Sequence, residues 1–156
     1  MTLQDLGSLG EFVAAIATLI TLIYLAAQIR QNTRSVRSAT SASISDSLSR
    51  VTETLSSQPG LARIWFQGGE QYESLTEEER QRFHLANLTY MRRLENAFYQ
   101  QERGFVDPDH WQTTERSLTS ALGRPGALSW WTRSKSIYSD RFVEFVKRHI
   151  SDVPIA

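Results

Sequence analysis

The sequence predicts an all-α protein: an N-terminal transmembrane helix that continues into a long stalk helix, followed by a small cytoplasmic helical bundle. Three observations predict this fold. Residues 12–29 are uncharged and mostly apolar, and residues 30–58 contain neither glycine nor proline. The rest of the chain has helix start and stop signals and lacks strand alternation bounded by hairpin turns. We therefore expect an anchor at 1–29, a stalk at 30–58 and a helical domain at 59–156.

The composition limits the function classes. A chain of 156 residues is the usual size of one domain with an appendage. Its 17 Lys and Arg residues balance 17 Asp and Glu residues, so no net positive field attracts nucleic acid, and we expect no nucleic-acid partner. Because cysteine is absent, the chain has no disulfide framework, no thiolate metal site and no cysteine nucleophile.

The apolar run from Phe12 to Ile29 is about eighteen residues long, at the lower edge of what crosses ~30 Å of hydrocarbon. Apolar residues occupy all sides of this helix, whereas a soluble surface helix would show one stripe. The alternatives are a core helix of a soluble bundle and a cleaved signal peptide. The second is disfavoured because Asp5 and Glu11, and no basic residue, precede the run.

The orientation follows from Arg30, Arg34 and Arg37, which come directly after the apolar run. The positive-inside rule places the N-terminus outside and residues 30–156 in the cytoplasm. Membrane lipid is therefore an expected partner, since each of these arginines contributes about 1 kcal/mol near anionic headgroups.

One face of the apolar helix repeats small residues: Gly10, Ala14 and Thr18, with Ala17 and Thr21 alongside. Small residues four apart let two helix backbones approach closely, so this face predicts a homo-oligomer. Alternatively, several copies could surround a pore into which Thr18, Thr21 and Gln28 project.

Three segments carry a resemblance to a known group of proteins: "LIYLAAQIRQNTRSVR", "RRLENAFYQQERGFVD" and "PGALSWW". In this order they resemble an uncharacterised family of bacterial single-pass membrane proteins with an N-terminal LIYLAxQIRQNTRxxR signature. The resemblance implies a protein anchored in the bacterial inner (cytoplasmic) membrane. It implies no reaction and no established site.

The segment 30–58 is rich in serine but has apolar residues at three- and four-residue spacings, which predicts one amphipathic stripe. This stripe consists of Val36, Ile44, Leu48, Val51 and Leu55. Pro59-Gly60 supplies a sharp stop. The alternative is a flexible serine-rich linker.

The expected domain contains five further helical segments. "LARIWFQGGE" forms a short helix that ends at the turn signal Gly68-Gly69. Thr76 and Glu79 have the spacing of a capping box. They open a helix that runs to about Arg103, with a core face at Phe83, Ala86, Leu88, Tyr90, Met91, Leu94, Ala97 and Phe98.

The remaining helices follow the same signals. Asp107-Pro108 is an N-cap followed by proline, and it opens a helix that ends at Gly123. Pro125 begins another helix, and Ser139 or Asp140 caps the last one. The inward residues are Trp111, Leu118, Leu122, Phe142, Val143, Phe145, Val146 and Ile150. The four tryptophans are expected in the core, with Trp130-Trp131 at the membrane surface as the alternative.

No catalytic signature appears. His84, His110 and His149 lie in separate predicted helices without metal-ligand spacing, and no phosphate loop or nucleophile elbow is present. We therefore expect no enzyme activity, no metal and no cofactor. The main polar cluster is Arg92, Glu95, Asn96 and Gln100, interpreted as a buried network that fixes helix register, with an internal binding pocket as the alternative.

The sequence thus predicts a membrane-anchored, homo-oligomeric scaffold or sensory protein without catalytic activity. The alternative function is an oligomeric pore for ions or small solutes, with one membrane helix per subunit. Nothing in the sequence names another protein partner.

Overall fold

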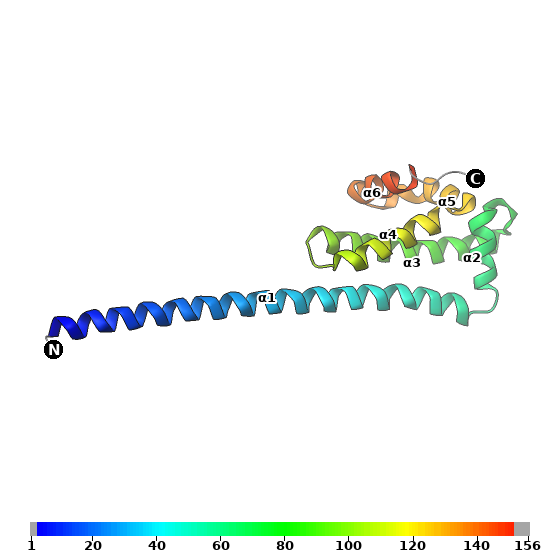
Figure 1. The fold of residues 1–156 in the computed structure, drawn as a ribbon. Coiled ribbons are helices and arrows are strands. Elements are labelled where there is room, and N and C mark those ends of the chain that lie inside the picture. Colours follow the sequence, from blue (N-terminus) through cyan, green and yellow to red (C-terminus); the bar gives the residue numbers. More distant parts are fainter. Residues whose placement is uncertain (1–2, 152–156) are drawn as a thin grey trace. The chain divides into compact units, whose positions relative to one another are not determined.

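The computed structural model describes residues 3–151, and it is all-α over this range (Figure 1). The described residues form six α-helices: α1 (Leu3–Ser57), α2 (Leu61–Glu70), α3 (Glu77–Glu102), α4 (Pro108–Leu122), α5 (Pro125–Ser134) and α6 (Asp140–Ser151). Two 3₁₀ turns connect them: η1 (Tyr72–Ser74) and η2 (Lys135–Ile137). The predicted class, a long N-terminal apolar helix followed by a small helical bundle, is confirmed.

The chain divides between Arg37 and Ser38 into two compact units. The first described unit is the N-terminal part of α1, in which every side chain from Gly10 to Arg37 is exposed. The absence of glycine and proline after Gly10 explains why the helix continues to Ser57. An unbroken helix beyond the apolar run is thus confirmed, and the flexible-linker alternative is wrong.

Residues 38–57, the second part of the expected stalk, belong to the same compact unit as the bundle. Ile44 and Val51 are each only 6% exposed, and Leu48 packs against the core. The stripe does not extend to Val36, which is exposed. The physical reason is that an amphipathic stripe buries itself wherever partner helices are within reach.

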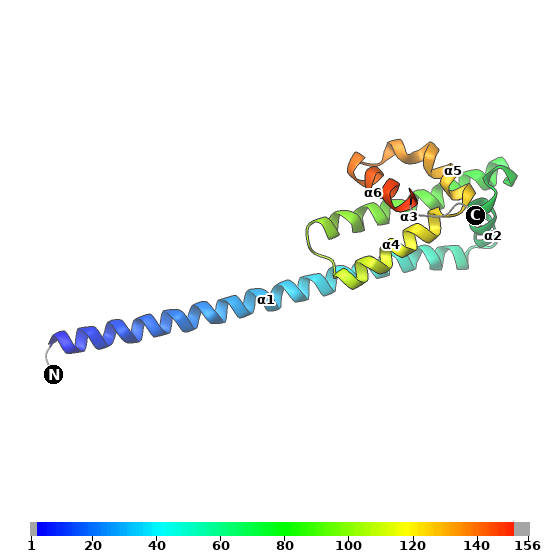
Figure 2. The same cartoon turned by 45° about the horizontal axis from the view of Figure 1, so that its top comes forward.

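The bundle is layered, and Figures 1 and 2 show the arrangement. Residues 38–57 of α1 lie on one side of α3 and α4, while α5 and α6 lie on the other side. The short helix α2 packs against α3 and α5. The core between these layers contains the fully buried side chains of Phe83, Met91, Leu118, Leu122, Trp130, Phe142 and Val146.

Local signals position the helix starts as the sequence predicts. At α3, the Thr76 hydroxyl accepts from the amide of Glu79 at 3.3 Å, and the Glu79 carboxylate accepts from the amide of Thr76 at 2.9 Å. At α4, the Asp107 carboxylate accepts from the amide of Asp109 at 3.0 Å. These bonds satisfy amides that a helix start otherwise leaves without partners. All four tryptophans are buried, so their expected core position is confirmed.

The expected turn at Gly68-Gly69 is wrong, because α2 continues through both residues to Glu70. Both glycines are buried for a reason of packing. A Cβ on Gly126, in the first turn of α5, would lie 2.1 Å from the carbonyl oxygen of Gly68. Gly126 therefore allows α2 and α5 to approach closely, whereas a Cβ on Gly68 would lie 2.6 Å from the Phe83 ring of α3 and one on Gly69 would lie 2.5 Å from the Arg124 guanidinium.

Candidate functional site

The first candidate site is the apolar segment 10–29, whose large side chains are exposed on every side of the helix. Phe12 is 64% exposed and Ile20 62%. The helix that contains this segment, α1, is the one helix among the described residues that is long and apolar enough to cross a membrane. Monomeric soluble proteins rarely expose a continuous apolar surface of this extent, so the segment needs lipid or another helix around it. The structure is therefore consistent with a single membrane span.

Two threonines of this segment satisfy their own hydroxyls. The hydroxyl of Thr18 donates to the carbonyl of Ala14 at 2.9 Å, and that of Thr21 to the carbonyl of Ala17 at 2.8 Å. Such bonds remove the main cost of a hydroxyl in hydrocarbon.

The residues predicted to form a shared face all belong to the one helix α1. At 3.6 residues per turn, they fall within an arc of roughly 100° on one side of it. They are Gly10, Ala14, Ala17, Thr18, Thr21 and Gln28, and all six are exposed. The predicted membrane-surface charges Arg30, Arg34 and Arg37 are exposed as well.

The second candidate site is the polar cluster on α3, of which the structure brings two members together. Arg92 donates to the carboxylate of Glu95 at 2.9 Å. The other oxygen of this buried carboxylate accepts from the amide of Ser139 at 2.9 Å and from the Ser139 hydroxyl at 3.0 Å. Glu95 therefore holds the residue that precedes α6, which fixes the start of that helix against α3.

The network also includes groups that the sequence does not identify. Arg92 donates to the carbonyl of Ile137 at 2.9 Å and lies 4.8 Å from the ring centroid of Tyr138. The Tyr99 hydroxyl donates to the Ser139 hydroxyl at 2.6 Å. Burial raises the pKa of Tyr138 to about 12, against the opposing effect of the charge on Arg92. The buried Tyr138 hydroxyl has no hydrogen-bond partner among the described residues, so Tyr138 contributes to this cluster through its ring.

Asn96 and Gln100, the other predicted members, do not join this network. The Asn96 side chain is exposed and that of Gln100 is half-buried. Neither side chain forms a hydrogen bond with a described residue. The cluster thus has the form of a helix-positioning network, because the buried carboxylate of Glu95 is used by Arg92 of the same helix and by Ser139 before α6.

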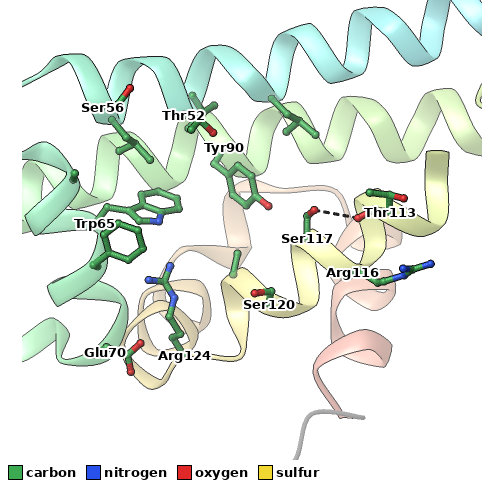
Figure 3. Close-up of a pocket in the computed structure, with 16 residues that line it drawn as sticks. Thr52, Ser56, Trp65, Glu70, Tyr90, Thr113, Arg116, Ser117, Ser120 and Arg124 are labelled. Atoms are coloured by element: carbon green, nitrogen blue, oxygen red, sulfur yellow. Dashed lines mark hydrogen bonds between the residues drawn. The ribbon is translucent and has the colours of Figure 1, made fainter. Parts of the chain in front are cut away.

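The third candidate site is a groove of about 840 Å³ within the bundle, shown in Figure 3. Its walls come from the second half of α1, from α2 and from α4, with Tyr90 of α3 between them. The apolar and aromatic part of the lining consists of Leu48, Val51, Leu55, Ala62, Trp65, Phe66, Tyr90 and Ala121. Residues from four helices build this groove, so no local motif predicts it.

Arg124, which precedes α5, extends its guanidinium into this groove beside Trp65 (Figure 3). The guanidinium carbon lies 5.9 Å from the ring centroids of Trp65 and of Phe66. Burial lowers the pKa of Arg124, while the negative charge of Glu70 acts against this shift. Burial raises the pKa of Tyr90 to about 12, so its hydroxyl keeps its proton at neutral pH.

The histidines are used separately. Trp130 donates its indole N–H to Nδ1 of His84 at 3.0 Å. The Nε2 atom of His110 lies 3.4 Å from the Ser45 hydroxyl, and that of His149 lies 3.4 Å from the Glu115 carboxylate. No group of three or more metal-ligating side chains converges within residues 3–151.

Comparison with known proteins adds no assignment: no family model, no curated protein and no solved structure matches this chain.

Proposed function

We propose that this protein is a single-span membrane protein that self-associates through its N-terminal helix and acts, without catalysis, as a scaffold or sensory module. The observation that carries the proposal is the exposure of apolar side chains on all sides of residues 10–29. A helix that exposes apolar side chains on every side is stable only in a lipid environment or against further copies of itself.

The charge distribution supports an orientation. Arg30, Arg34 and Arg37 follow the apolar run, and no lysine or arginine precedes it. In this proposal the N-terminus lies outside and residues 30–156 lie in the cytoplasm. The resemblance of "LIYLAAQIRQNTRSVR" to bacterial single-pass membrane proteins supports the bacterial inner membrane as the location.

The small-residue face supports self-association. Ala14 lies on the same side of the helix as Gly10 and Thr18, whereas Ala15 lies about 100° further round. A dry helix–helix contact on this side uses backbone approach and dispersion, the forces available in lipid. The intrahelical bonds of Thr18 and Thr21 leave these hydroxyls no need of a water-filled lumen. For this reason we favour packed helices over the alternative of a pore.

The matched pair Ala14→Leu and Ala15→Leu tests self-association, because both variants add the same side chain at adjacent positions. We expect sedimentation equilibrium of the full-length protein in a mild detergent to give a protein mass per particle of two or more times the chain mass of 17.8 kDa. Ala14→Leu should shift the mass toward the monomer, and Ala15→Leu should leave it unchanged. A monomeric wild type, or an equal shift in both variants, would contradict the proposal.

Membrane insertion has its own test. Ile20→Arg places a charge near the centre of the apolar run, at a cost of about 2.5–3.5 kcal/mol for insertion. We expect the wild type to remain in the membrane fraction after alkaline extraction and the variant to lose a large part of this fraction. A wild type recovered in the soluble fraction would remove the basis of the proposal. Conductance in planar bilayers, abolished by Gln28→Leu, would favour the pore instead.

A further inference from the structure

The groove in the bundle is lined by three hydrogen-bond donors that have no acceptor among the described residues. The guanidinium of Arg124, the hydroxyl of Tyr90 and the indole N–H of Trp65 all line it. None of the three donates a hydrogen bond to a described residue. Donors that line a groove and form no bond with a described residue are available to a ligand with acceptor atoms.

Arg124 differs in this respect from Arg133 and Arg92. Arg133 pairs with Glu73 at 2.6 Å, and Arg92 pairs with Glu95 at 2.9 Å. Arg124 has ring contacts in place of a carboxylate, and these stabilise its positive charge without accepting its N–H groups. Glu70 lines the same groove, and its negative charge raises the pKa of Arg124, but the two side chains form no ion pair. Among residues 3–151, no side chain supplies Arg124 with the bidentate acceptor that a guanidinium prefers.

The rest of the groove suits an apolar body. Leu48, Val51 and Leu55 of α1 and Phe66 of α2 line the groove. A volume of about 840 Å³ falls within the range of roughly 300–1,000 Å³ that small-molecule sites occupy. Hydroxyl groups of Thr52 and Ser120 add polar positions along the walls (Figure 3).

The charges of the groove favour a carboxylate over a phosphate as the ligand. Arg116 also lines the groove, but its guanidinium is turned away from Arg124 and donates to the side chain of Gln112 (Figure 3). One cation, with the negative charge of Glu70 nearby, matches a monoanion better than a dianion. The planar fork of Arg124 also matches the two oxygens of a carboxylate.

We propose that this groove is a binding site for a small amphipathic carboxylate, whose oxygens accept hydrogen bonds from Arg124 and Tyr90 while its apolar body lies between α1 and α2. The site would give the bundle a ligand-sensing role. It rests on residues 48–124 alone and does not depend on self-association of the apolar helix, so each proposal can fail without the other.

Isothermal titration calorimetry of the full-length protein in lipid nanodiscs tests the site, with empty nanodiscs as the blank. The probes are 4-phenylbutanoate and its neutral isostere 4-phenylbutanamide. We expect saturable binding of the acid and at least tenfold weaker binding of the amide, since the amide lacks the charge that Arg124 recognises. Equal binding of the two probes would assign the groove to an uncharged apolar ligand and overturn the proposal, as would no saturable binding of the acid.

Variants place the binding in this groove. Arg124→Gln should weaken binding of 4-phenylbutanoate at least tenfold, whereas Arg82→Gln, which makes the same charge change on the bundle outside the groove, should leave binding unchanged. Because Arg124 also packs against Gly69, Tyr90→Phe provides a second variant that removes a single hydroxyl. It should weaken binding several-fold with an unchanged melting temperature. An equal loss in Arg82→Gln, or full affinity in Tyr90→Phe and Arg124→Gln, would overturn the assignment.

Discussion

Residues 10–29 and residues 44–55 both belong to α1, and their apolar side chains have different surroundings. In the first stretch, Leu19 and Ile23 are exposed, as are the apolar residues on every other side. In the second, Ile44 and Val51 are buried, and polar and charged residues occupy the exposed sides. The two stretches have the same backbone conformation, so the distribution of apolar residues around the helix makes the difference. A single stripe matches partners within the chain, whereas an apolar surface on all sides requires a surrounding medium or further copies.

Polar groups show the same contrast. Thr18 and Thr21 bond to carbonyls of their own helix, four residues back. In the bundle, the carboxylate of Glu95 bonds to Ser139, 44 residues later, and the indole of Trp130 bonds to His84, 46 residues earlier. The apolar segment is therefore satisfied locally, while the bundle depends on long-range pairs that define its tertiary structure.

The largest effect that separates the two regions is expected for Phe142→Ala, because Phe142 is fully buried at the centre of an aromatic cluster with Phe98 and Phe145. Truncation should lower the free energy of unfolding by about 3–5 kcal/mol, from lost burial and the cavity left behind. Denaturant titration of the full-length protein in a nonionic detergent measures this through tryptophan fluorescence. All four tryptophans lie in the bundle, so this signal reports on the bundle.

Ile20→Ala is the control, since Ile20 is exposed and belongs to the apolar segment. It should leave the fluorescence transition unchanged. A comparable loss of stability from Ile20→Ala would mean that the apolar segment packs into the bundle, which would contradict the difference between the two stretches of α1.

A smaller effect is expected for Gly126→Ala. The added Cβ would overlap the carbonyl oxygen of Gly68, a backbone atom that moves only if α2 shifts relative to α5. Overpacking of this kind costs about 1–3 kcal/mol, which exceeds the gain of up to ~1 kcal/mol from replacing glycine in a helix. The same denaturant titration measures the loss.

Gly10→Ala is the matched control in the apolar segment, where a Cβ would meet no atom within 4 Å. It should leave the bundle as stable as the wild type. A stabilised Gly126→Ala variant would show that α2 and α5 are not held in this close contact.

The features predicted correctly from the sequence are those set by neighbours in the chain. Thr76 and Glu79, three residues apart, specify the start of α3, and Asp107-Pro108 specifies that of α4. The contact of Arg92 with Glu95 is local in the same way, because residues three apart lie next to each other on a helix, although the sequence assigns the two residues to one polar cluster without pairing them.

The features that the sequence does not predict depend on residues far apart in the chain. Gly68-Gly69 is a pair typical of a turn, but Gly68 lies within α2, and its carbonyl oxygen contacts Gly126, 58 residues later. The stripe at Ile44 and Val51 predicts an apolar face without naming the helices that cover it. The groove around Arg124 combines four helices, so its donors have no common sequence pattern.

The smallest effect concerns the pH dependence of the bundle. The pKa of Glu79 is lowered from 4.5 to about 2, first by its hydrogen bond with the Arg63 guanidinium and then by the amide of Thr76. The folded state therefore holds the Glu79 carboxylate in its charged form more strongly than the unfolded state does. The resulting stabilisation is fully present above pH 4.5 and is lost as the pH falls through about 2.

Glu79→Gln should accordingly be less stable than the wild type at pH 7, and the difference should shrink as the pH falls from 4.5 to 2. Denaturant midpoints of both proteins at several pH values in a nonionic detergent measure this difference. Arg63→Gln removes the largest cause of the shift, so in that background the stabilisation should be lost at a higher pH. Because the apolar segment has no charge from Phe12 to Ile29, its helicity should not respond over the same range. A difference between wild type and Glu79→Gln that stays constant with pH would mean that the carboxylate contributes through its shape in the capping box rather than through its charge.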